Sequence, residues 1–139
     1  MSAIKDVDVQ IVAWHSDAGQ LRRLLDSLAL EAAGAVALHV AIADNSVDRA
    51  ASDALQALAA PYATRFASLR VLVNAENVGF GRAHNALARD ARSDWLLLLN
   101  PDSALLPGTL DVLLARAATD AVAAAFECRQ QPFEHPKNY

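Results

Sequence analysis

Four short polar segments carry the side chains that could bind a ligand or take part in chemistry. They are Trp14-His15-Ser16, Asp44 to Asp48, Asn77 to Asn85 and Asn100-Pro101-Asp102. Each follows, directly or closely, a run of apolar residues that is typical of a buried strand. Together they offer carboxylates, amides, glycines and aromatic rings, which are groups that bind nucleotides and divalent cations.

The carboxylate of Asp102 is the best candidate for a metal ligand. It follows the leucines at 96–99 and the rigid Asn100-Pro101 step, so a buried strand would end by presenting it. One carboxylate beside a diphosphate suits a hard cation such as Mg²⁺ or Mn²⁺, which takes several ligands from phosphate oxygens. The alternative that Asn100 to Ser103 is only a turn stays open, because all four residue types favour turns.

Asp44 ends another apolar run and could accept a hydrogen bond from a base N–H or a ribose hydroxyl. A structural interpretation makes Ser46 or Asp48 the N-cap of a following helix. The two interpretations are compatible, with Asp44 functional and Asp48 capping.

The segment from Asn77 to Asn85 has Gly79 and Gly81 just before an expected helix. Glycine lets backbone N–H groups approach a ligand, and a helix N-terminus favours anionic oxygens. The spacing is neither the dinucleotide fingerprint nor a Walker P-loop, which disfavours nicotinamide-dependent oxidoreductases and P-loop NTPases. On spacing alone, a tight turn remains an alternative.

Other polar residues have simpler interpretations. Trp14 could stack on a base, but on its residue type alone we favour a core anchor, and His15 is left open. His39 lies inside a strand pattern and is expected to be a hydrogen-bonded structural histidine. Cys128 is expected to be an inert, half-buried thiol, since no basic pair lies near it in the sequence.

The elements that must position these residues alternate along the chain. Strand patterns cover residues 7–14, 36–43, 69–73, 95–99 and 122–126. Helical patterns begin near residue 21, ending at Gly34, and cover residues 48–60 and about 82–91. A last helix is expected to start with Pro107 as its first residue. The continuous apolar run from Trp95 to Leu99 resembles a strand covered on both faces. This alternation predicts an α/β, Rossmann-like, doubly wound parallel sheet, in which ligands bind at the carboxyl ends of strands.

Composition narrows the class of protein. The 139 residues fit one domain, and a net charge of −4 argues against binding nucleic acid through bulk positive charge. The single cysteine excludes a disulfide framework and suits a reducing compartment. The N-terminus lacks the apolar core of a signal peptide, so we expect a cytoplasmic protein, with peripheral association at the inner membrane face as an alternative.

In this order, the four segments resemble the nucleotide-sugar-binding half of a family 2 glycosyltransferase. Asn-Val-Gly-Phe-Gly at 77–81 and Asn-Pro-Asp at 100–102, together with Leu106-Pro107-Gly108 and the tail from Arg129 to Lys137, are similar to the rhamnosyltransferase-like branch. The resemblance covers essentially the whole chain. It implies a GT-A fold, a dTDP- or UDP-sugar donor carrying rhamnose or another hexose, inversion at the anomeric carbon and a divalent cation.

The resemblance also assigns residues. Asp44 would contact the base, and Asp102 would bind the cation as the last residue of an Asp-x-Asp-type motif whose first position is Asn100 here. Trp14-His15 stands where a Tyr-Asn-like pair is common. The residues expected to contact the donor are Trp14, His15, Asp44, Asn45, Asn77, Gly79, Phe80, Gly81, Asn85 and Asn100.

The catalytic base is unknown from this sequence. By the resemblance, residues 1–139 form the donor-binding portion, while the acceptor-binding half with its general base lies beyond the equivalent of Tyr139. Glu127 and Glu134 are not placed near any acceptor. We therefore expect donor and metal binding with weak or no transfer by this chain alone.

Three hypotheses follow. The favoured one is an enzyme of polysaccharide biosynthesis in the cell envelope that acts on a glycan or lipid-linked acceptor. The second is a nucleotide-sugar-binding module without catalytic activity. A receiver-like signalling domain is the third, but it would require an acidic cluster after the first strand, where Trp14-His15-Ser16 stands. Self-association is expected if the missing half leaves apolar sheet exposed.

Overall fold

The computed structural model describes residues 5–132 and divides the chain into two compact units, residues 1–107 and 108–139. The elements of the first unit are β1 (Lys5–Ala13), α1 (Ala18–Ala32), β2 (Val36–Asp44), α2 (Arg49–Ala59), a 3₁₀ turn η1 (Ala60–Tyr62), β3 (Ser68–Val73), α3 (Phe80–Ala88) and β4 (Trp95–Leu99). The second unit contains α4 (Thr109–Thr119).

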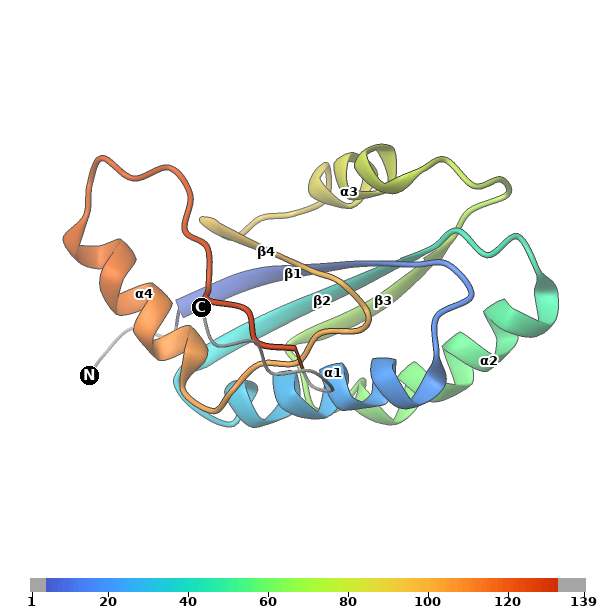
Figure 1. Cartoon of the computed structure of the whole chain (residues 1–139), viewed down its shortest axis with the longest axis horizontal. Helices are drawn as coiled ribbons and strands as arrows, with labels where there is room; N and C mark the ends of the chain where they lie inside the picture. Colours follow the sequence, from blue (N-terminus) through green and yellow to red (C-terminus); the bar gives the residue numbers. More distant parts are fainter. Residues whose placement is uncertain (1–4, 133–139) are drawn as a thin grey trace. The chain divides into compact units, whose positions relative to one another are not determined.

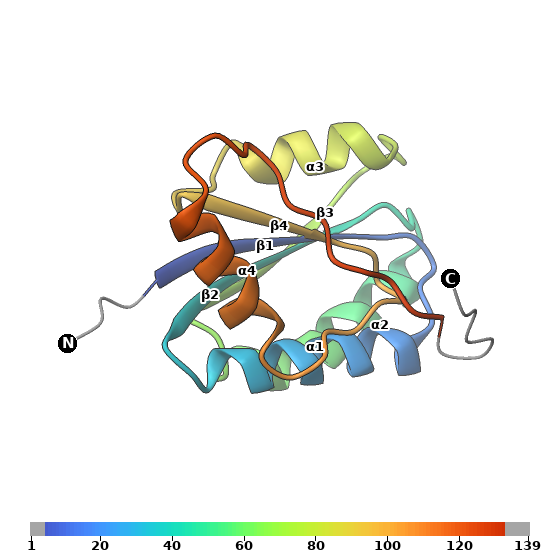
Figure 2. The same cartoon turned by 60° about the vertical axis from the view of Figure 1, so that its left-hand side comes forward.

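The four strands form one parallel sheet in the order β3-β2-β1-β4. Helices α1 and α2 cover one face of the sheet and α3 covers the other (Figure 1), and the turned view in Figure 2 shows the same layers. The predicted α/β, doubly wound architecture is therefore confirmed. The strand order reverses at β1, because β2 and β3 lie on one side of it and β4 on the other.

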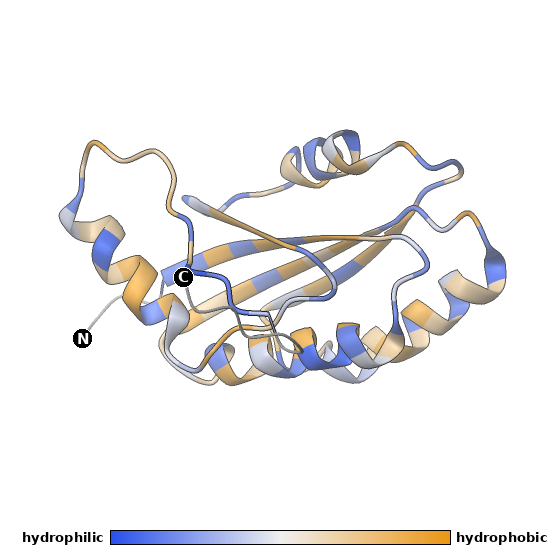
Figure 3. Ribbon diagram, viewed as in Figure 1, coloured by the Kyte–Doolittle hydropathy of each residue, from blue (hydrophilic) through white to orange (hydrophobic). Residues whose placement is uncertain are grey.

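The main core lies between the sheet and α1. Leu21, Leu24, Leu25 and Leu28 form the predicted helical stripe, and all are buried. Figure 3 shows apolar and polar segments alternating along α1 and α2, as in helices with one buried face. Burying each such leucine contributes about 1.5–3 kcal/mol relative to an exposed one. This layer holds β1 and β2 rigidly, and with them the loops at their ends.

Smaller side chains line the opposite face. Val12, Ala41 and Ala43 of the sheet form a buried cluster with Ala83 and Leu87 of α3. Because alanine keeps the surfaces flat, α3 can approach β1 and β2 closely. The N-terminus of α3 is thus held near the carboxyl ends of these strands.

The expectation that β4 is covered on both faces is wrong within the part of the chain that the structure describes. Leu96 and Leu98 are 45% and 51% exposed. Their register partners in β1 are Asp8 and Gln10, which lie on the face that α3 covers. Helix α3 contacts β1 and β2, so it leaves this face of the edge strand open.

The fifth strand predicted at 122–126 is not present. The backbone N–H groups of Val122 and Ala123 donate to the Asp120 carboxylate instead of to a neighbouring strand. Val122 is 93% exposed. An isolated apolar run has no ladder partner for its backbone, so its composition alone does not make it a strand.

Two helices begin at other residues than predicted. Helix α3 starts at Phe80 and ends at Ala88, rather than spanning 82–91, and α4 starts after Gly108, so Pro107 precedes the N-cap. The caps Gly79 and Gly108 have φ angles of +83° and +82°. Such angles strongly favour glycine, so these two residues set the helix starts.

Several smaller expectations also have outcomes. No helix within residues 5–132 is long and apolar enough to cross a membrane. Cys128 is exposed, not half-buried as predicted. His39 bonds Ser68 at 3.0 Å and Asp6 at 2.8 Å, which confirms its structural role. Glu134 and the end of the predicted tail motif lie outside the described residues.

Candidate functional site

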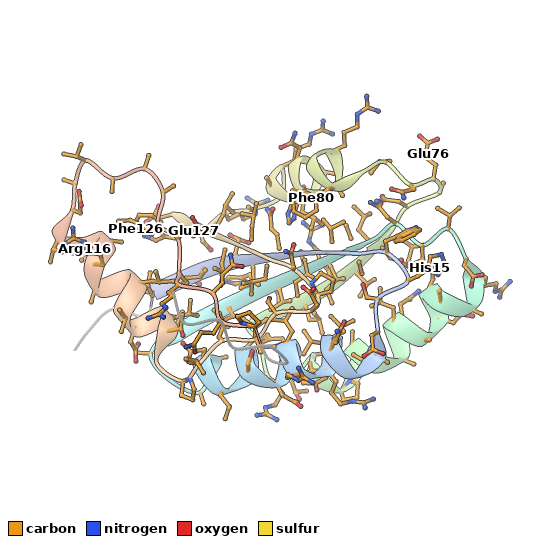
Figure 4. All side chains as sticks on the ribbon, viewed as in Figure 1. His15, Glu76, Phe80, Arg116, Phe126 and Glu127 are labelled. Atoms are coloured by element: carbon orange, nitrogen blue, oxygen red, sulfur yellow. The ribbon has the colours of Figure 1, made fainter. Side chains whose placement is uncertain are left out.

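The candidate site is the carboxyl edge of the sheet, where the loops after all four strands emerge. In doubly wound sheets a crevice forms where the strand order reverses, which here is between the ends of β1 and β4. The predicted site residues belong to these loops, apart from Asp44, which is the last residue of β2, and Phe80, Gly81 and Asn85, which belong to α3. His15 follows β1, Glu76 follows β3 and Phe80 begins α3 (Figure 4).

Asp44 is fully buried at the end of β2, with an exposed fraction of 1%. Its Oδ1 accepts from the Ser46 N–H at 2.9 Å, and its Oδ2 accepts a short hydrogen bond from the Ser52 hydroxyl of α2. Burial raises the pKa of Asp44, but the hydrogen bonds from Ser46 and Ser52 outweigh burial and hold the pKa below its usual value. A buried carboxylate thus ties the β2 loop to α2 in its ionised form.

Asn45 is the centre of a hydrogen-bond network that joins the loops. Its N–H donates to the Ala13 carbonyl of β1 at 2.8 Å, and its side chain donates to the Gly79 carbonyl at 3.3 Å. Its Oδ1 accepts from the Asn74 amide at 2.7 Å. Asn45 therefore fixes the ends of β1 and β3 and the N-cap of α3 relative to β2.

The loops after β1 and β2 are also joined by strained residues. His15 and Val47 have φ angles of +44° and +54°, and the His15 N–H donates to the Ser46 hydroxyl at 2.9 Å. Positive φ is unusual for histidine and a clear outlier for a β-branched valine, costing about 1–3 kcal/mol each. Strain of this kind is common at binding sites, where the surrounding structure holds it in place.

Two aromatic rings are exposed at this edge. Trp14 is 62% exposed, so its interpretation as a core anchor is wrong, and Phe80 is 57% exposed. Trp14 contacts His15 edge-to-face at a centroid distance of 5.3 Å, and Phe80 contacts His84 at 4.4 Å. The burial of β1 ends at Ala13, so the next side chain leaves the core.

The start of α3 presents backbone groups as predicted, although the helix starts earlier. The Asn77 side chain accepts from the Gly79 N–H at 3.0 Å, which shapes the turn into the helix. Gly81 lies in the first helical turn and has no atom within 4 Å of an added Cβ. Asn85 is exposed and lies five residues beyond Phe80, about 7.5 Å further along the axis.

Asn100 to Ser103 form the turn that the sequence left as an alternative. The Asn100 carbonyl accepts from the Ser103 N–H at 3.1 Å and from its hydroxyl at 2.7 Å. Asp102 is exposed at this turn, and its carboxylate accepts no hydrogen bond from residues 5–132. The turn and a functional Asp102 are therefore compatible.

A divalent cation fits this edge only if most of its ligands come from a bound diphosphate and from water. Within residues 5–132, no three His, Cys, Asp or Glu side chains come together to hold a metal ion. In the loop directly after β4, residues 100–107, Asp102 alone supplies an accessible carboxylate. This single carboxylate suits a cation that takes its remaining ligands from a diphosphate and from water.

Four buried or partly buried polar residues were missed by the sequence interpretation. Ser52 and Asn74 support Asp44 and Asn45, while Gln10 and His84 contact each other beneath α3 at 3.2 Å. With its amide nitrogen toward His84, Gln10 also accepts from the Ala88 N–H at 3.1 Å. One signal was available, because Gln10 is a polar residue inside an otherwise apolar strand.

His84 is uncharged under ordinary conditions. It is 5% exposed, and its Nε2 has no hydrogen-bond partner among the residues described. Burial lowers the pKa of His84, since the charged imidazolium would lose its hydration. The imidazole therefore packs as a neutral group between Phe80 and the sheet.

Comparison with known protein families shows which family this chain belongs to. The sequence profile named "Glycosyl transferase family 2" matches residues 9–139. The chain belongs to glycosyl transferase family 2. This membership confirms the resemblance seen in the loop motifs, and it accounts for a sheet whose polar residues gather at one edge.

Relatives of this glycosyltransferase sequence include an N-acetylglucosaminyl-diphospho-decaprenol L-rhamnosyltransferase of Mycobacterium tuberculosis. It is 32% identical over 125 residues, which cover 81% of this chain and 38% of the relative. The same values hold for the protein of a second strain. The chain thus spans less than half the length of the curated relatives it matches.

Solved structures show the same fold. Mannosyltransferase PcManGT from Pyrobaculum calidifontis, in complex with GDP-Man and Mn²⁺, has a TM-score of 0.74 at 18% identity, covering 92% of this chain and 36% of its own. TarS of S. aureus, residues 1–349 with UDP-GlcNAc, has a TM-score of 0.68 at 19% identity, covering 94% and 38%. The first unit therefore has the GT-A arrangement of strands and helices.

Proposed function

We propose that this chain is the donor-binding part of a glycosyltransferase that transfers a sugar from a nucleoside-diphosphate sugar to a glycan or lipid-linked acceptor. The observation that carries the proposal is the exposed Asp102 at the end of β4, across the point of strand reversal from the loop after β1. The rhamnosyltransferase relative, by its name, acts on a lipid-linked acceptor, which supports rhamnose and such an acceptor for this chain.

The exposed groups would contact the donor, and the buried ones would hold them in place. Trp14, His15 and Phe80 offer rings to a nucleobase, since stacking accepts any base. The glycine-bounded start of α3 offers N–H groups to the donor oxygens. Asp44 and Asn45 keep the loops in register, and direct contact of either with the donor stays a prediction.

Asp102 would be the protein's ligand to a divalent cation, a role supported by the Mn²⁺ named in the mannosyltransferase complex. When bound, such a cation would neutralise the diphosphate as it leaves the anomeric carbon. Asn100 carries no charge, so one carboxylate from this loop balances the cation. The remaining charge would come from the donor, which makes donor and metal binding interdependent.

Inversion requires that an acceptor hydroxyl attack the anomeric carbon from the side opposite the diphosphate. A general base must take the hydroxyl proton. Asp44 is ionised but buried and hydrogen-bonded, so it is unsuited to this role. From the resemblance to family 2 enzymes, we propose that the base belongs to a part of the protein outside this chain, and that donor recognition by the described part takes place in the cytoplasm.

A nucleotide-sugar-binding module without catalysis is the second candidate. It is favoured by the same observation, since Asp102 would serve donor and metal binding and no general base has been assigned among the described residues. Release of free nucleoside diphosphate in the presence of donor and acceptor separates the two. Rapid transfer by the 139-residue chain would refute the module and the expectation of weak activity.

The proposal is tested by calorimetric titration of UDP, dTDP and GDP with and without Mn²⁺. Asp102→Ala is compared with Asp94→Ala, because Asp94 immediately precedes β4 and its replacement changes the charge equally at the opposite edge. We expect Mn²⁺-dependent binding to weaken at least tenfold in Asp102→Ala and to persist in Asp94→Ala. Equal metal-dependent affinity in both variants, or no binding of any nucleotide by the folded chain, would refute the proposal.

A further inference from the structure

A cavity lies away from the carboxyl edge, between α1 and the segment formed by the end of α2 and η1. Its volume is about 320 Å³, within the range of small-ligand sites. Its polar lining consists of Arg22 and Asp26 of α1, Tyr62 of η1 and Arg65 of the following loop. None of the predicted donor-site residues lines it.

The two arginines of this cavity are available to a ligand. Within residues 5–132, neither the Arg22 nor the Arg65 guanidinium forms an ion pair or a hydrogen bond. Both side chains are exposed at the rim. Guanidinium groups bind phosphate and carboxylate oxygens through paired N–H donors, so two unpaired ones at one cavity favour an anion.

The carboxylate of Asp26 is held by another group. The Tyr62 hydroxyl donates to Asp26 Oδ1 at 2.6 Å, and the Tyr62 ring is stacked on Phe66. Burial raises the pKa of Tyr62 to about 12, and the Asp26 charge adds to the rise while Arg22 and Arg65 oppose it. The hydroxyl therefore stays protonated, and both guanidiniums lie within electrostatic reach of it.

The rest of the lining is apolar. Ala57, Leu58 and Pro61 form the wall contributed by α2 and η1. An apolar wall beside two cations suits an anionic group attached to carbon rather than a bare hydrated ion. A phosphate monoester offers three terminal oxygens, enough for a paired contact with one guanidinium and a further contact with a second, whereas a carboxylate offers two.

We propose that this cavity binds the phosphate group of a phosphate ester, carried by either a membrane lipid headgroup or a soluble molecule. Arg22 and Arg65 would contact the phosphate oxygens, and the wall of Ala57, Leu58 and Pro61 would contact the attached carbon chain. Asp26 would oppose the anion and so limit its affinity. This site is independent of the donor site proposed above.

The test uses the 139-residue chain and two kinds of probe at constant ionic strength. Glycerol 3-phosphate is titrated while the arginine Nε–H signals are followed by NMR. Vesicles of phosphatidylglycerol are compared with vesicles of phosphatidylcholine by co-sedimentation. Binding of glycerol 3-phosphate identifies a soluble ester as a ligand, and binding to phosphatidylglycerol vesicles alone identifies a lipid headgroup.

Variants locate the binding. Arg22→Gln and Arg65→Gln should each weaken it at least fivefold, whereas Arg89→Gln, at the end of α3 on the opposite face of the sheet, should leave it within twofold. Asp26→Asn should tighten binding at least threefold by removing the opposing charge. Thermal unfolding of each variant establishes that it is folded.

Two kinds of result would overturn the proposal. One is binding of neither probe by the folded chain. The other is a loss in Arg89→Gln as large as in Arg22→Gln, which would show a non-specific charge effect, or an affinity unchanged by Asp26→Asn, which would place the binding away from this cavity.

Discussion

The hydrogen bond between Ser52 and Asp44 should stabilise the folded chain and the donor edge together. In Ser52→Ala, the buried Asp44 carboxylate loses its donor from α2. A hydrogen bond to a charged group contributes about 1.5–3 kcal/mol. Alanine is the better helix former by about 0.5 kcal/mol. The free energy of unfolding at pH 7 should therefore fall by about 1–2.5 kcal/mol.

The pH dependence of this loss is specific to the charge of Asp44. The folded-state pKa of Asp44 is lower than its usual value of 3.8. The stabilisation by the ionised carboxylate is thus complete above pH 3.8 and is lost as the pH falls through the folded-state pKa. Removing the hydrogen bond from Ser52 raises the folded-state pKa of Asp44 in the variant. The difference between Ser52→Ala and the unmodified chain should therefore be full at pH 7 and should shrink as the pH falls through the folded-state pKa values of Asp44 in the two proteins.

Urea unfolding measures the effect, with Ser27→Ala as the matched control. The Ser27 hydroxyl donates to the Leu24 carbonyl at 2.7 Å and accepts from the Leu105 N–H at 3.0 Å, so both of its partners are neutral. Its replacement should destabilise the protein equally at all these pH values. An undiminished stability in Ser52→Ala, or a difference that stays constant through acid, would refute the role assigned to ionised Asp44.

Three further predictions concern single residues. Gly79→Ala should lower the free energy of unfolding by about 1–3 kcal/mol, because Gly79 has a φ of +83°. Gly81→Ala, in the open first turn of α3, should be neutral or stabilising by up to about 1 kcal/mol. Thermal unfolding of the two variants side by side measures the contrast. The pKa of His84 is below 6.5, so the folded state loses stability as the pH falls below that value; His84→Gln should flatten this slope between pH 7 and 5 in urea titrations. Leu98→Lys should change stability by less than about 1 kcal/mol and reduce any self-association seen by sedimentation, since Leu98 and Leu96 are about half exposed; a greater tendency to associate would contradict this.

Much of the architecture could be predicted because apolar residues repeat with the helical period, or follow one another in strand-length runs, over short stretches of the chain. The leucines of α1 repeat with the helical period, and the apolar runs of β1 and β2 are long enough to be read as strands. Since parallel strands end at one edge, the polar residues after them had to meet there. The sequence alone therefore predicts where the candidate site lies, and the family motifs fall in the same loops.

What could not be predicted depends on contacts between distant segments. The apolar run at 122–126 matches a strand in composition, yet a strand exists only beside a partner. Trp14 matches a core residue in type, but it lies one position beyond the last buried residue of β1. In both cases the deciding fact is what lies next to the residue in space.

The same reason separates the two kinds of site residue. Sequence order alone determined that Asp44, Asn45 and Asp102 follow strands and share an edge. Only the tertiary structure decided that Ser52 and Asn74 bond Asp44 and Asn45, so that these two are buried and hold the loops while Asp102 is left exposed. A local pattern sets which backbone a segment adopts, but a buried polar group must find its hydrogen-bond partner wherever the fold supplies one.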